Sequence, residues 1–384
     1  MYIPALYGFH LIYFISYGVS SFFPKYFGEI GLLDSQIGIL ASIPAIIGVL
    51  LQPYWGSLTD RLRFKKTLLI GLLTGLGVVC VFLNYQQSFL MLLPGMICYQ
   101  ILQLPIAPIY STISLEYLQD LRRPYGPIRM VGTIGYQLGA LLVGFFFTHS
   151  LQGIYGFLAA VVFISCFLSF LLPPVEGHQH GKQKVSVRVL LQDKHILLLL
   201  AMVLVGTITS QFYLAFFGKH LGDLGIDNSQ TGIILIASVL LEIPFLFSSH
   251  KIARKTSIWN WLLVGFAINA VRFAGLAFTK SVPVIIFYQL LGMSVMACFE
   301  FFPLLYLNIL VPDALKGSAQ NALMIVSFGI SKVIGSLIGG FISQRIGIPA
   351  MFLGNAVLLV MGICIFWKAT RRAIREEGNL LTQA

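Results

Sequence analysis

The sequence predicts an all-α integral membrane protein with twelve transmembrane helices, arranged as two parallel-repeat six-helix bundles. Hydrophobic residues make up 57% of its 384 residues and charged residues only 10%, and the mean hydropathy is +0.87. A soluble domain with a single core does not have this composition. The apolar residues also gather in runs of membrane-spanning length, and one connection between two runs recurs in the second half of the chain.

An apolar stretch of about 20 residues is long enough to cross the hydrocarbon core of a bilayer as a helix. An even number of such spans puts both termini on the same side. The twelve predicted spans lie near residues 3–27, 36–58, 67–86, 90–116, 127–148, 152–172, 196–218, 230–249, 258–279, 282–310, 317–343 and 348–368.

Lys and Arg residues are distributed unevenly between the two sets of loops. Most lie after the even-numbered spans, whereas the opposite loops hold only Lys25, Lys219, Lys280 and Arg345. Basic residues favour the cytoplasmic side, which predicts cytoplasmic termini for a multi-pass protein of the cell membrane. The same distribution accounts for the formal net charge of +11 without nucleic-acid binding.

An internal repeat divides the chain into two halves. The stretch from Phe22 to Gly38 recurs as Phe216 to Gly232, with matching Lys, Gly, Ser and Gln positions. Both copies join an odd-numbered span to an even-numbered one, so the halves have the same topology. We expect an N-terminal bundle at 1–172, a polar cytoplasmic linker at 173–195, and a C-terminal bundle with a short tail at 196–384.

Five charged residues fall inside apolar runs: Arg129, Glu242, Arg272, Glu300 and Lys332. A charge at the centre of a bilayer costs at least about 2.5–3.5 kcal/mol, so such residues are rare, usually paired and often functional. Together they indicate a polar cavity that serves transport.

The connection between the second and third predicted spans carries a motif. It reads Gly56-Ser-Leu58-Thr-Asp60-Arg61-Leu-Arg63-Phe-Lys65-Lys66 and resembles the cytoplasmic loop signature of the major facilitator superfamily. The resemblance implies a gating loop, in which Asp60 and Arg61 make charge contacts between helix ends. The pattern has a second Gly where this chain has Arg63, and a basic loop that only fixes topology is the alternative interpretation.

Two further stretches resemble the lactose-permease and phenylpropionate-permease-like branch of proton symporters. They are Tyr125–Tyr136 and the pair Leu241-Glu242 with Asn269–Gly275. The resemblance implies that Arg129 binds the substrate, that Tyr136 stacks on it, that Glu242 both binds and couples, and that Arg272 is the charge partner of Glu242. Lys332 matches a lysine of helix eleven.

The chain departs from that branch in helix ten, where Gln289, Gly292 and Val295 replace its Lys, His and Glu. Glu300 offers a replacement, because desolvation favours the neutral form of a buried carboxyl group. We therefore expect Glu242 and Glu300 to carry the proton, with Arg272 and Lys332 as their ionic partners. A static Glu242–Arg272 pair, a snorkelling Lys332 and a topological role for Arg129 remain the structural alternatives.

The sequence contains no zinc-protease, nucleophile-elbow or phosphate-loop motif, so we expect neither an enzyme nor a cofactor, and no metal site. The predicted function is a proton-coupled symporter that imports a small polar organic solute, with a sugar or glycoside as first choice. Its expected partners are the solute, protons and the lipid bilayer, and the protein is expected to be a monomer. Alternatives are an organic-anion or aromatic-acid proton symporter, a drug/proton antiporter, a uniporter and a non-transporting membrane sensor.

Overall fold

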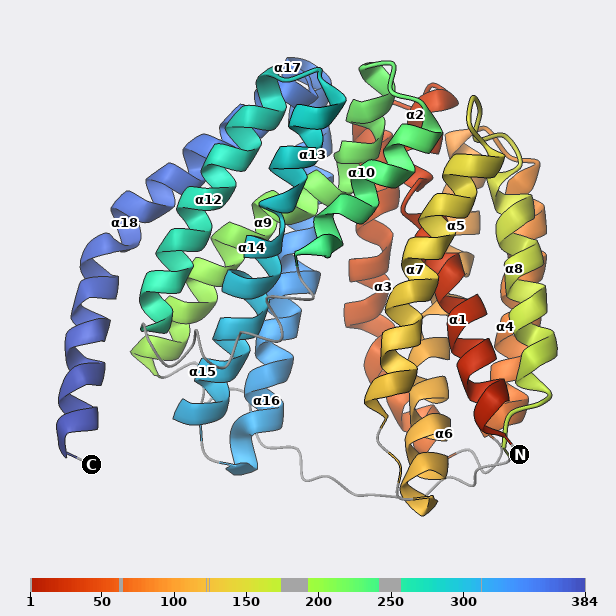
Figure 1. The fold of residues 1–384 in the computed structure, drawn as a ribbon, viewed down its shortest axis with the longest axis horizontal. Helices are drawn as coiled ribbons and strands as arrows, with labels where there is room; N and C mark the ends of the chain where they lie inside the picture. The colour runs from red at the N-terminus through yellow and green to blue at the C-terminus, as the bar shows by residue number, and fades with distance from the viewer. Residues whose placement is uncertain are drawn as a thin grey trace. The chain divides into compact units, whose positions relative to one another are not determined.

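The computed structural model describes residues 2–61, 65–121, 123, 125–173, 193–241, 257–311 and 313–383. The regular structure of these residues is helical (Figure 1). The chain forms two compact units, and each contains a short segment from the other half of the sequence. Unit 1 consists of Met1–Gln36, Leu40–Lys182 and Leu221–Ile233, and unit 2 of Ile37–Ile39, Gln183–His220 and Ile234–Ala384.

The predicted limits of the two halves remain a prediction. Most of the expected linker, residues 174–192, lies outside the described residues.

The helices of the first half begin close to the predicted spans. They are α1 (Ile3–Ser20), α2 (Phe23–Glu29), α3 (Asp34–Arg61), α4 (Lys65–Asn84), α5 (Phe89–Gln103), α6 (Ile106–Asp120), α7 (Gly126–Phe146) and α8 (Ile154–Ser169).

The described residues of the second half are more interrupted and include three π-helical segments. Its helices are α9 (Lys194–Asp223), α10 (Asn228–Leu240), α12 (Ile258–Phe278), α13 (Val282–Leu290), α14 (Met293–Val295), η2 (Met296–Phe301), α15 (Phe302–Leu310), α16 (Asp313–Met324), η3 (Ile325–Ile330), η4 (Val333–Ile338), α17 (Gly339–Ile346) and α18 (Ile348–Gln383).

The prediction of an all-α membrane protein is confirmed. Among the described residues, ten helices or continuous helix runs are long and apolar enough to cross a membrane, and Ile154–Ser169 is a shorter apolar helix at the sixth predicted span. The eighth predicted span begins as α10, and its part beyond residue 241 lies outside the described residues.

Proline interrupts two of the predicted spans. The first span is two helices, α1 and α2, and Pro24 stands in the first turn of α2. The fourth span is likewise divided, because α5 ends at Gln103 and Pro105 precedes α6. Proline has no N–H to donate and its ring crowds the carbonyl four residues earlier, so the helix restarts at each position.

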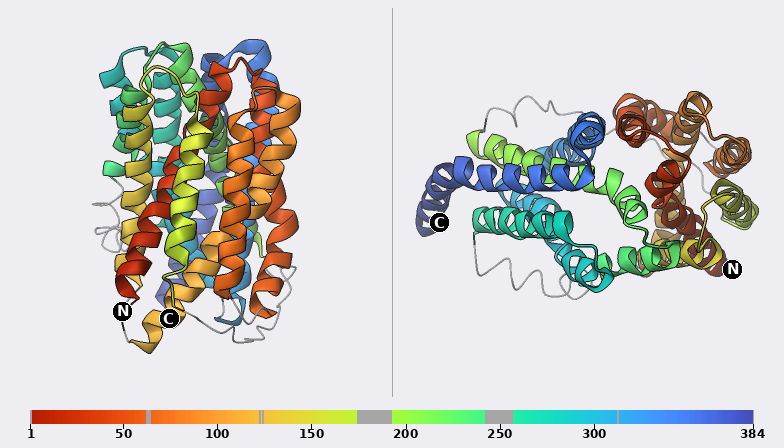
Figure 2. Two further views of the ribbon diagram at one scale, coloured as in Figure 1. Left: turned by 90° about the vertical axis from the view of Figure 1, so that its right-hand side faces the viewer. Right: turned by 90° about the horizontal axis from the view of Figure 1, so that it is seen from above.

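The core of unit 1 is built around α1. This helix packs on α7 and α8, and α4 packs on α5 and α8, as the views of Figures 1 and 2 agree. Five of the largest fully buried side chains lie in this unit: Phe9, Tyr13, Phe22, Tyr110 and Tyr155. In unit 2, α12 packs on α18 and η2, around the fully buried Trp259, Phe266, Phe273 and Phe299.

The repeated sequence forms the same turn in both copies. After α2, Gly31 has a φ of 79° and its N–H bonds to Gly28 O, while Leu32 N–H bonds to Phe27 O. After α9, Gly225 has a φ of 74°, and the corresponding bonds join it to Gly222 O and join Ile226 to Leu221 O. Both are Schellman motifs, in which a left-handed glycine satisfies the last carbonyl groups of a helix.

Segment 221–233 is held within unit 1 by polar contacts at its start. Lys25 is buried, and its Nζ donates to Ile226 O at 2.6 Å and to Thr231 Oγ1 at 2.9 Å. Asn228 N–H donates to Thr148 O at 3.1 Å. These bonds anchor the start of α10 on the end of α7 and on α2.

We predict that Gly31→Ala and Gly225→Ala each destabilise the protein by about 1–2 kcal/mol, the cost of placing an L-residue in the left-handed region. No atom lies within 4 Å of a Cβ at either position, so strain in the backbone is the only cause. Gly71→Ala and Gly354→Ala are the controls. Both glycines lie within helices and likewise have no atom within 4 Å of a Cβ, so alanine should leave the stability unchanged or increase it. Thermal unfolding of the purified variants measures this, and an equal effect at all four glycines would contradict it.

Candidate functional site

Helix α7 carries both substrate-binding residues predicted in the first half. Arg129 lies in its first turn and is exposed, and Tyr136 is half-buried. The two residues are seven positions apart, which is close to two full turns, so they share one face of the helix. Gly132 and Gly139 lie beside them on that face. The prediction that Arg129 and Tyr136 act together therefore fits the helix geometry, and their roles remain proposals.

The glycines of α7 set the distance to α1. A Cβ at Gly135 would collide with Leu11 O, and one at Gly139 with Ile15 O. From the other side, a Cβ at Gly18 would collide with the carbonyl oxygen of Tyr136. Small residues of this kind let two membrane helices approach until their backbones touch. The backbone of Tyr136 is thus fixed by direct contact with α1.

His10 on α1 is a polar residue beside this pair. It is 2% exposed, and its ring lies 4.4 Å from the ring of Phe14 and 5.1 Å from that of Tyr110, between centroids. A Cβ at Gly132 would come within 2.5 Å of Nε2, so the glycine makes room for the imidazole. Neither ring nitrogen has a hydrogen-bond partner among the described residues, although Arg129 acts on the ring electrostatically. Buried polar groups without partners are rare in native structures.

A second polar cluster lies in unit 2 around Arg272, which is 2% exposed. Its Nη2 donates to Gln289 Oε1 at 2.8 Å, and its Cζ lies 4.2 Å from the centre of the Tyr213 ring. Tyr213 and Gln289 are also hydrogen-bonded to each other, at 2.6 Å from Nε2 to the hydroxyl oxygen. The guanidinium group of Arg272 is thus held by the Gln289 amide on α13 and by the Tyr213 ring on α9.

Sequence reasoning expected Glu242 as the partner of Arg272. Glu242 lies outside the described residues, so this pair stays a prediction. Reasoning from sequence missed Tyr213 and treated Gln289 only as the loss of a charged residue. The sequence did contain a signal for Tyr213 and Gln289, because both are polar residues within apolar spans. A polar side chain in such a span needs a hydrogen-bond partner on another helix.

Glu300 and Lys332 lie at the irregular helix segments. Glu300 is half-buried within η2, and the half-buried Lys332 separates η3 from η4. π-helical turns occur frequently at functional sites. Pro303 explains η2, since it cannot donate to Phe299 O and thereby loosens the preceding turn. Near Lys332, Ser331 Oγ donates to Val326 O at 2.6 Å, five residues earlier, and reaches Thr207 Oγ1 on α9 at 2.6 Å.

The predicted gating residues lie on a helix rather than in a loop. Helix α3 continues to Arg61, three residues beyond the predicted end of the span, and therefore includes Gly56, Asp60 and Arg61. Their side chains are outside the described part of the structure, so the gating role stays a prediction. Helix α3 runs on because Ser57 to Arg61 contain neither proline nor glycine.

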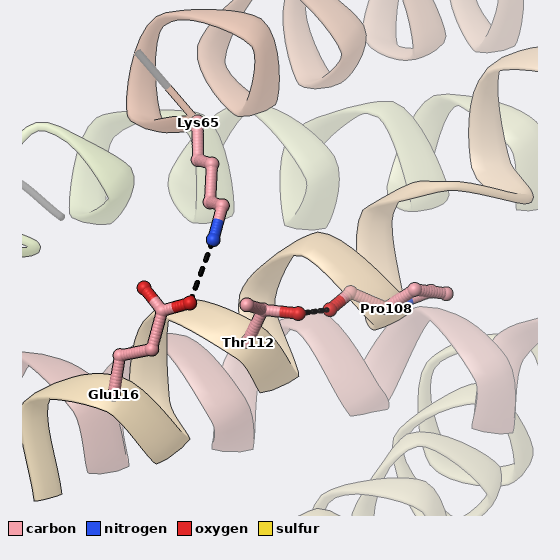
Figure 3. A network of polar contacts seen from close by, with 4 residues as sticks. All are labelled: Lys65, Pro108, Thr112 and Glu116. Carbon is pink, nitrogen blue, oxygen red and sulfur yellow. Dashed lines mark hydrogen bonds and ion pairs between the residues drawn. The ribbon is translucent and has the colours of Figure 1, made fainter. Parts of the chain in front are cut away.

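Two lysines of the same motif make contacts within unit 1. Lys65 Nζ lies 2.8 Å from Glu116 Oε1 on α6, and its side chain is 6% exposed (Figure 3). Lys66 Nζ donates to Phe170 O and Leu172 O, at 2.7 and 2.8 Å. The start of α4 is thereby tied to α6 and to the chain that follows α8.

The family model described as the MFS_1 like family matches residues 4–353 of this chain. An uncharacterised transporter of Bacillus subtilis, YwbF, is 26% identical over 370 residues, covering 93% of this chain and 91% of that protein. A maltose permease of Geobacillus stearothermophilus is 24% identical, covering 90% and 88%. Lactose permease of Klebsiella oxytoca and a probable 3-phenylpropionic acid transporter of Escherichia coli are also similar, at 22% and 24% identity.

A solved structure has the same fold. The crystal structure of a variant of the nucleoside transporter NupG superposes with a TM-score of 0.87 at 18% sequence identity, over 96% of this chain and 99% of that one. At this identity the likeness concerns the fold alone.

We predict that Gln289→Leu destabilises the protein by about 1.5–3 kcal/mol, the value of a hydrogen bond to a charged group, because it removes the acceptor of the buried guanidinium. Tyr213→Phe keeps the ring beside Arg272 and loses only the hydroxyl, so about 1 kcal/mol is expected. Thermal unfolding of both variants measures the difference. Equal losses would mean that Gln289 contributes no more than the Tyr213 hydroxyl does.

We predict that Glu116→Gln destabilises the protein by about 3 kcal/mol or more, because it leaves the Lys65 ammonium buried beside a neutral group. The double variant Lys65→Met/Glu116→Gln should recover most of this loss, since no charge then stays buried. A double-mutant cycle in thermal or denaturant unfolding tests it. Additive effects of the two single changes would mean that the pair is not coupled.

Proposed function

Because the chain belongs to the MFS_1-like family, and is therefore a secondary transporter and not an enzyme, we propose that it is a proton-coupled symporter. The proposed cargo is a small polar organic solute, imported by alternating access, with a sugar or glycoside as first choice. The observation that carries this proposal is the pair Arg129 and Tyr136 on one face of α7, held against α1 through glycines.

These two side chains suit a sugar for physical reasons. A guanidinium group donates several hydrogen bonds in a fixed plane, which fits adjacent hydroxyl groups. An aromatic ring can cover the apolar face of a pyranose. The similarity to a maltose permease supports the same choice. His10, buried beside Arg129, keeps this region of unit 1 polar.

Proton coupling is proposed to reside in unit 2, at Glu242 and Glu300. The half-buried Glu300 sits in a π-helical segment, and such segments are frequent at functional sites. Glu242 and Glu300 would bind and release the proton, with Arg272 and Lys332 as the cations that favour their ionised forms. Asp60 and Arg61, at the end of α3, are the proposed gating contacts.

An aromatic carboxylate is the second candidate cargo. Two cations, Arg129 and Lys332, would attract an anion, and Tyr136 would stack on its ring. The similarity to a probable 3-phenylpropionic acid transporter favours this alternative. We further propose a monomer in the bacterial cytoplasmic membrane. The distribution of Lys and Arg between the loops supports cytoplasmic termini.

The test is proton uptake by proteoliposomes during addition of a panel of glycosides, nucleosides and aromatic acids. We predict that one class triggers proton influx in the wild type. Glu300→Gln or Glu242→Gln should reduce accumulation of the solute by at least about tenfold. Both variants should retain substrate counterflow, which needs no net proton movement. Arg129→Gln should raise KM by about tenfold or more, the value of one lost charged hydrogen bond.

Two variants serve as controls. Asp223→Asn removes an exposed carboxylate at the end of α9, and Met130→Ala changes the exposed neighbour of Arg129. Both should transport like the wild type. Solute entry without proton movement, unchanged in the Glu variants, would contradict coupling and leave a uniporter.

A further inference from the structure

Helix α18 continues far beyond the length that a bilayer requires. It begins at Ile348, after Gly347 with a φ of 84°, and runs without a break to Gln383 (Figure 1). At 1.5 Å per residue, the 20 residues from Ile348 to Trp367 span about 30 Å, the thickness of the hydrocarbon core. Trp367 is therefore expected at the membrane interface, where tryptophan is enriched.

One face of α18 changes its chemistry at this depth. Val357, Met361 and Ile365 are 57%, 50% and 66% exposed. Lys368 and Arg372 continue the same face, at spacings of three and four residues, and are exposed. A surface that is apolar for several turns and then basic matches a lipid molecule, whose acyl chains end at a phosphate.

Four cations surround Trp367 on the exposed side. Lys368, Arg371, Arg372 and Arg375 are exposed, and together with Trp367 they occupy an arc of roughly 140° around the helix. The guanidinium carbon of Arg371 lies 4.5 Å from the centre of the Trp367 ring. Glu376 and Glu377 follow in the sequence and end the basic stretch.

The opposite side of this segment is packed in unit 2. Thr370 is fully buried, and its Oγ1 lies 3.7 Å from Met202 Sδ on α9, while Ala373 is 3% exposed. The segment is thus fixed on the protein by one side and presents its cations on the other. Cations placed where lipid headgroups lie attract anionic lipids, by about 1 kcal/mol each, which is about a fivefold change in affinity.

We propose that Trp367, Lys368, Arg371, Arg372 and Arg375 form a binding site for the headgroup of an anionic phospholipid such as phosphatidylglycerol. The phosphate contacts the cations, the acyl chains follow Ile365 and Met361, and Trp367 marks the boundary between the two. This site is separate from the transport residues and does not depend on the identity of the cargo.

The experiment uses the full chain in bilayers that contain brominated lipids, which quench nearby tryptophan. Subtracting the signal of Trp367→Phe isolates the fluorescence of Trp367 from that of the other three tryptophans. Brominated phosphatidylglycerol should quench Trp367 with an apparent affinity at least about fivefold higher than brominated phosphatidylcholine, and high salt should weaken this preference.

Variants assign the preference to the cations. Lys368→Gln/Arg372→Gln leaves Arg371 beside Trp367, and should lower the preference about fivefold for each cation removed, until it disappears. Arg345→Gln, an exposed cation at the end of α17, should leave it unchanged. Glycerol phosphate added in solution should not compete, because it lacks the acyl chains.

Three outcomes would overturn the proposal. They are equal quenching by both lipids in the wild type, an undiminished preference in the double variant, and displacement by glycerol phosphate or by an acidic polypeptide. The last would assign the cations to a soluble anion or to an acidic protein. Quenching that is retained in the Arg345→Gln control verifies that a variant of this kind is folded and inserted.

Discussion

The direct backbone contact between α1 and α7 is the constraint on which the arrangement of unit 1 depends. Gly18, Gly135 and Gly139 have carbonyl groups of the facing helix where a Cβ would otherwise be. Any side chain larger than hydrogen would push the helices apart. That separation would move Tyr136, whose own carbonyl touches Gly18, and would open the packing around His10. The placement of the proposed binding residues thus follows from positions that have no side chain.

Unit 2 positions its charged residues in a different way. Its span at 282–310 is divided among four helical segments, and Ser318–Ile346 contains two π-helical turns. Gly335 and Gly339 again allow close contact, here with Ile208 O and the Phe212 ring of α9. The hydroxyl of Ser331 bonds to a carbonyl five residues earlier, which accommodates the wider turn. Lys332 is therefore carried by a backbone with an irregular hydrogen-bond pattern, whereas Arg129 is carried by a regular helix.

Sequence reasoning predicted what depends on long-range averages. The apolar runs marked the spans, because a bilayer requires about 20 apolar residues whatever their order. The repeat predicted two halves of the same topology, and the structure adds that each copy contains a left-handed glycine turn, at Gly31 and Gly225. Sequence reasoning did not predict the π-helical segments, since these reflect competition between neighbouring carbonyl groups. Nor did it predict the Lys65–Glu116 pair, because a lysine in a basic stretch gives no sign of which helix it will meet.

The three most buried Lys and Arg side chains among the described residues differ in how their charge is balanced. Lys65 has a carboxylate, Glu116, at 2.8 Å. Lys25 donates to a carbonyl and a hydroxyl oxygen, with Glu29 and Asp227 acting only at longer range. Arg272 has an amide oxygen and aromatic rings as its partners among the described residues. Neutral partners satisfy hydrogen bonds and leave most of the charge uncompensated. Among the described residues, the hydrogen-bond partner of Arg272 is thus neutral, whereas Glu116 neutralises Lys65. This difference supports the proposal that Arg272 is the cation beside a proton-binding carboxylate, whereas Lys65 stabilises the contact between α4 and α6.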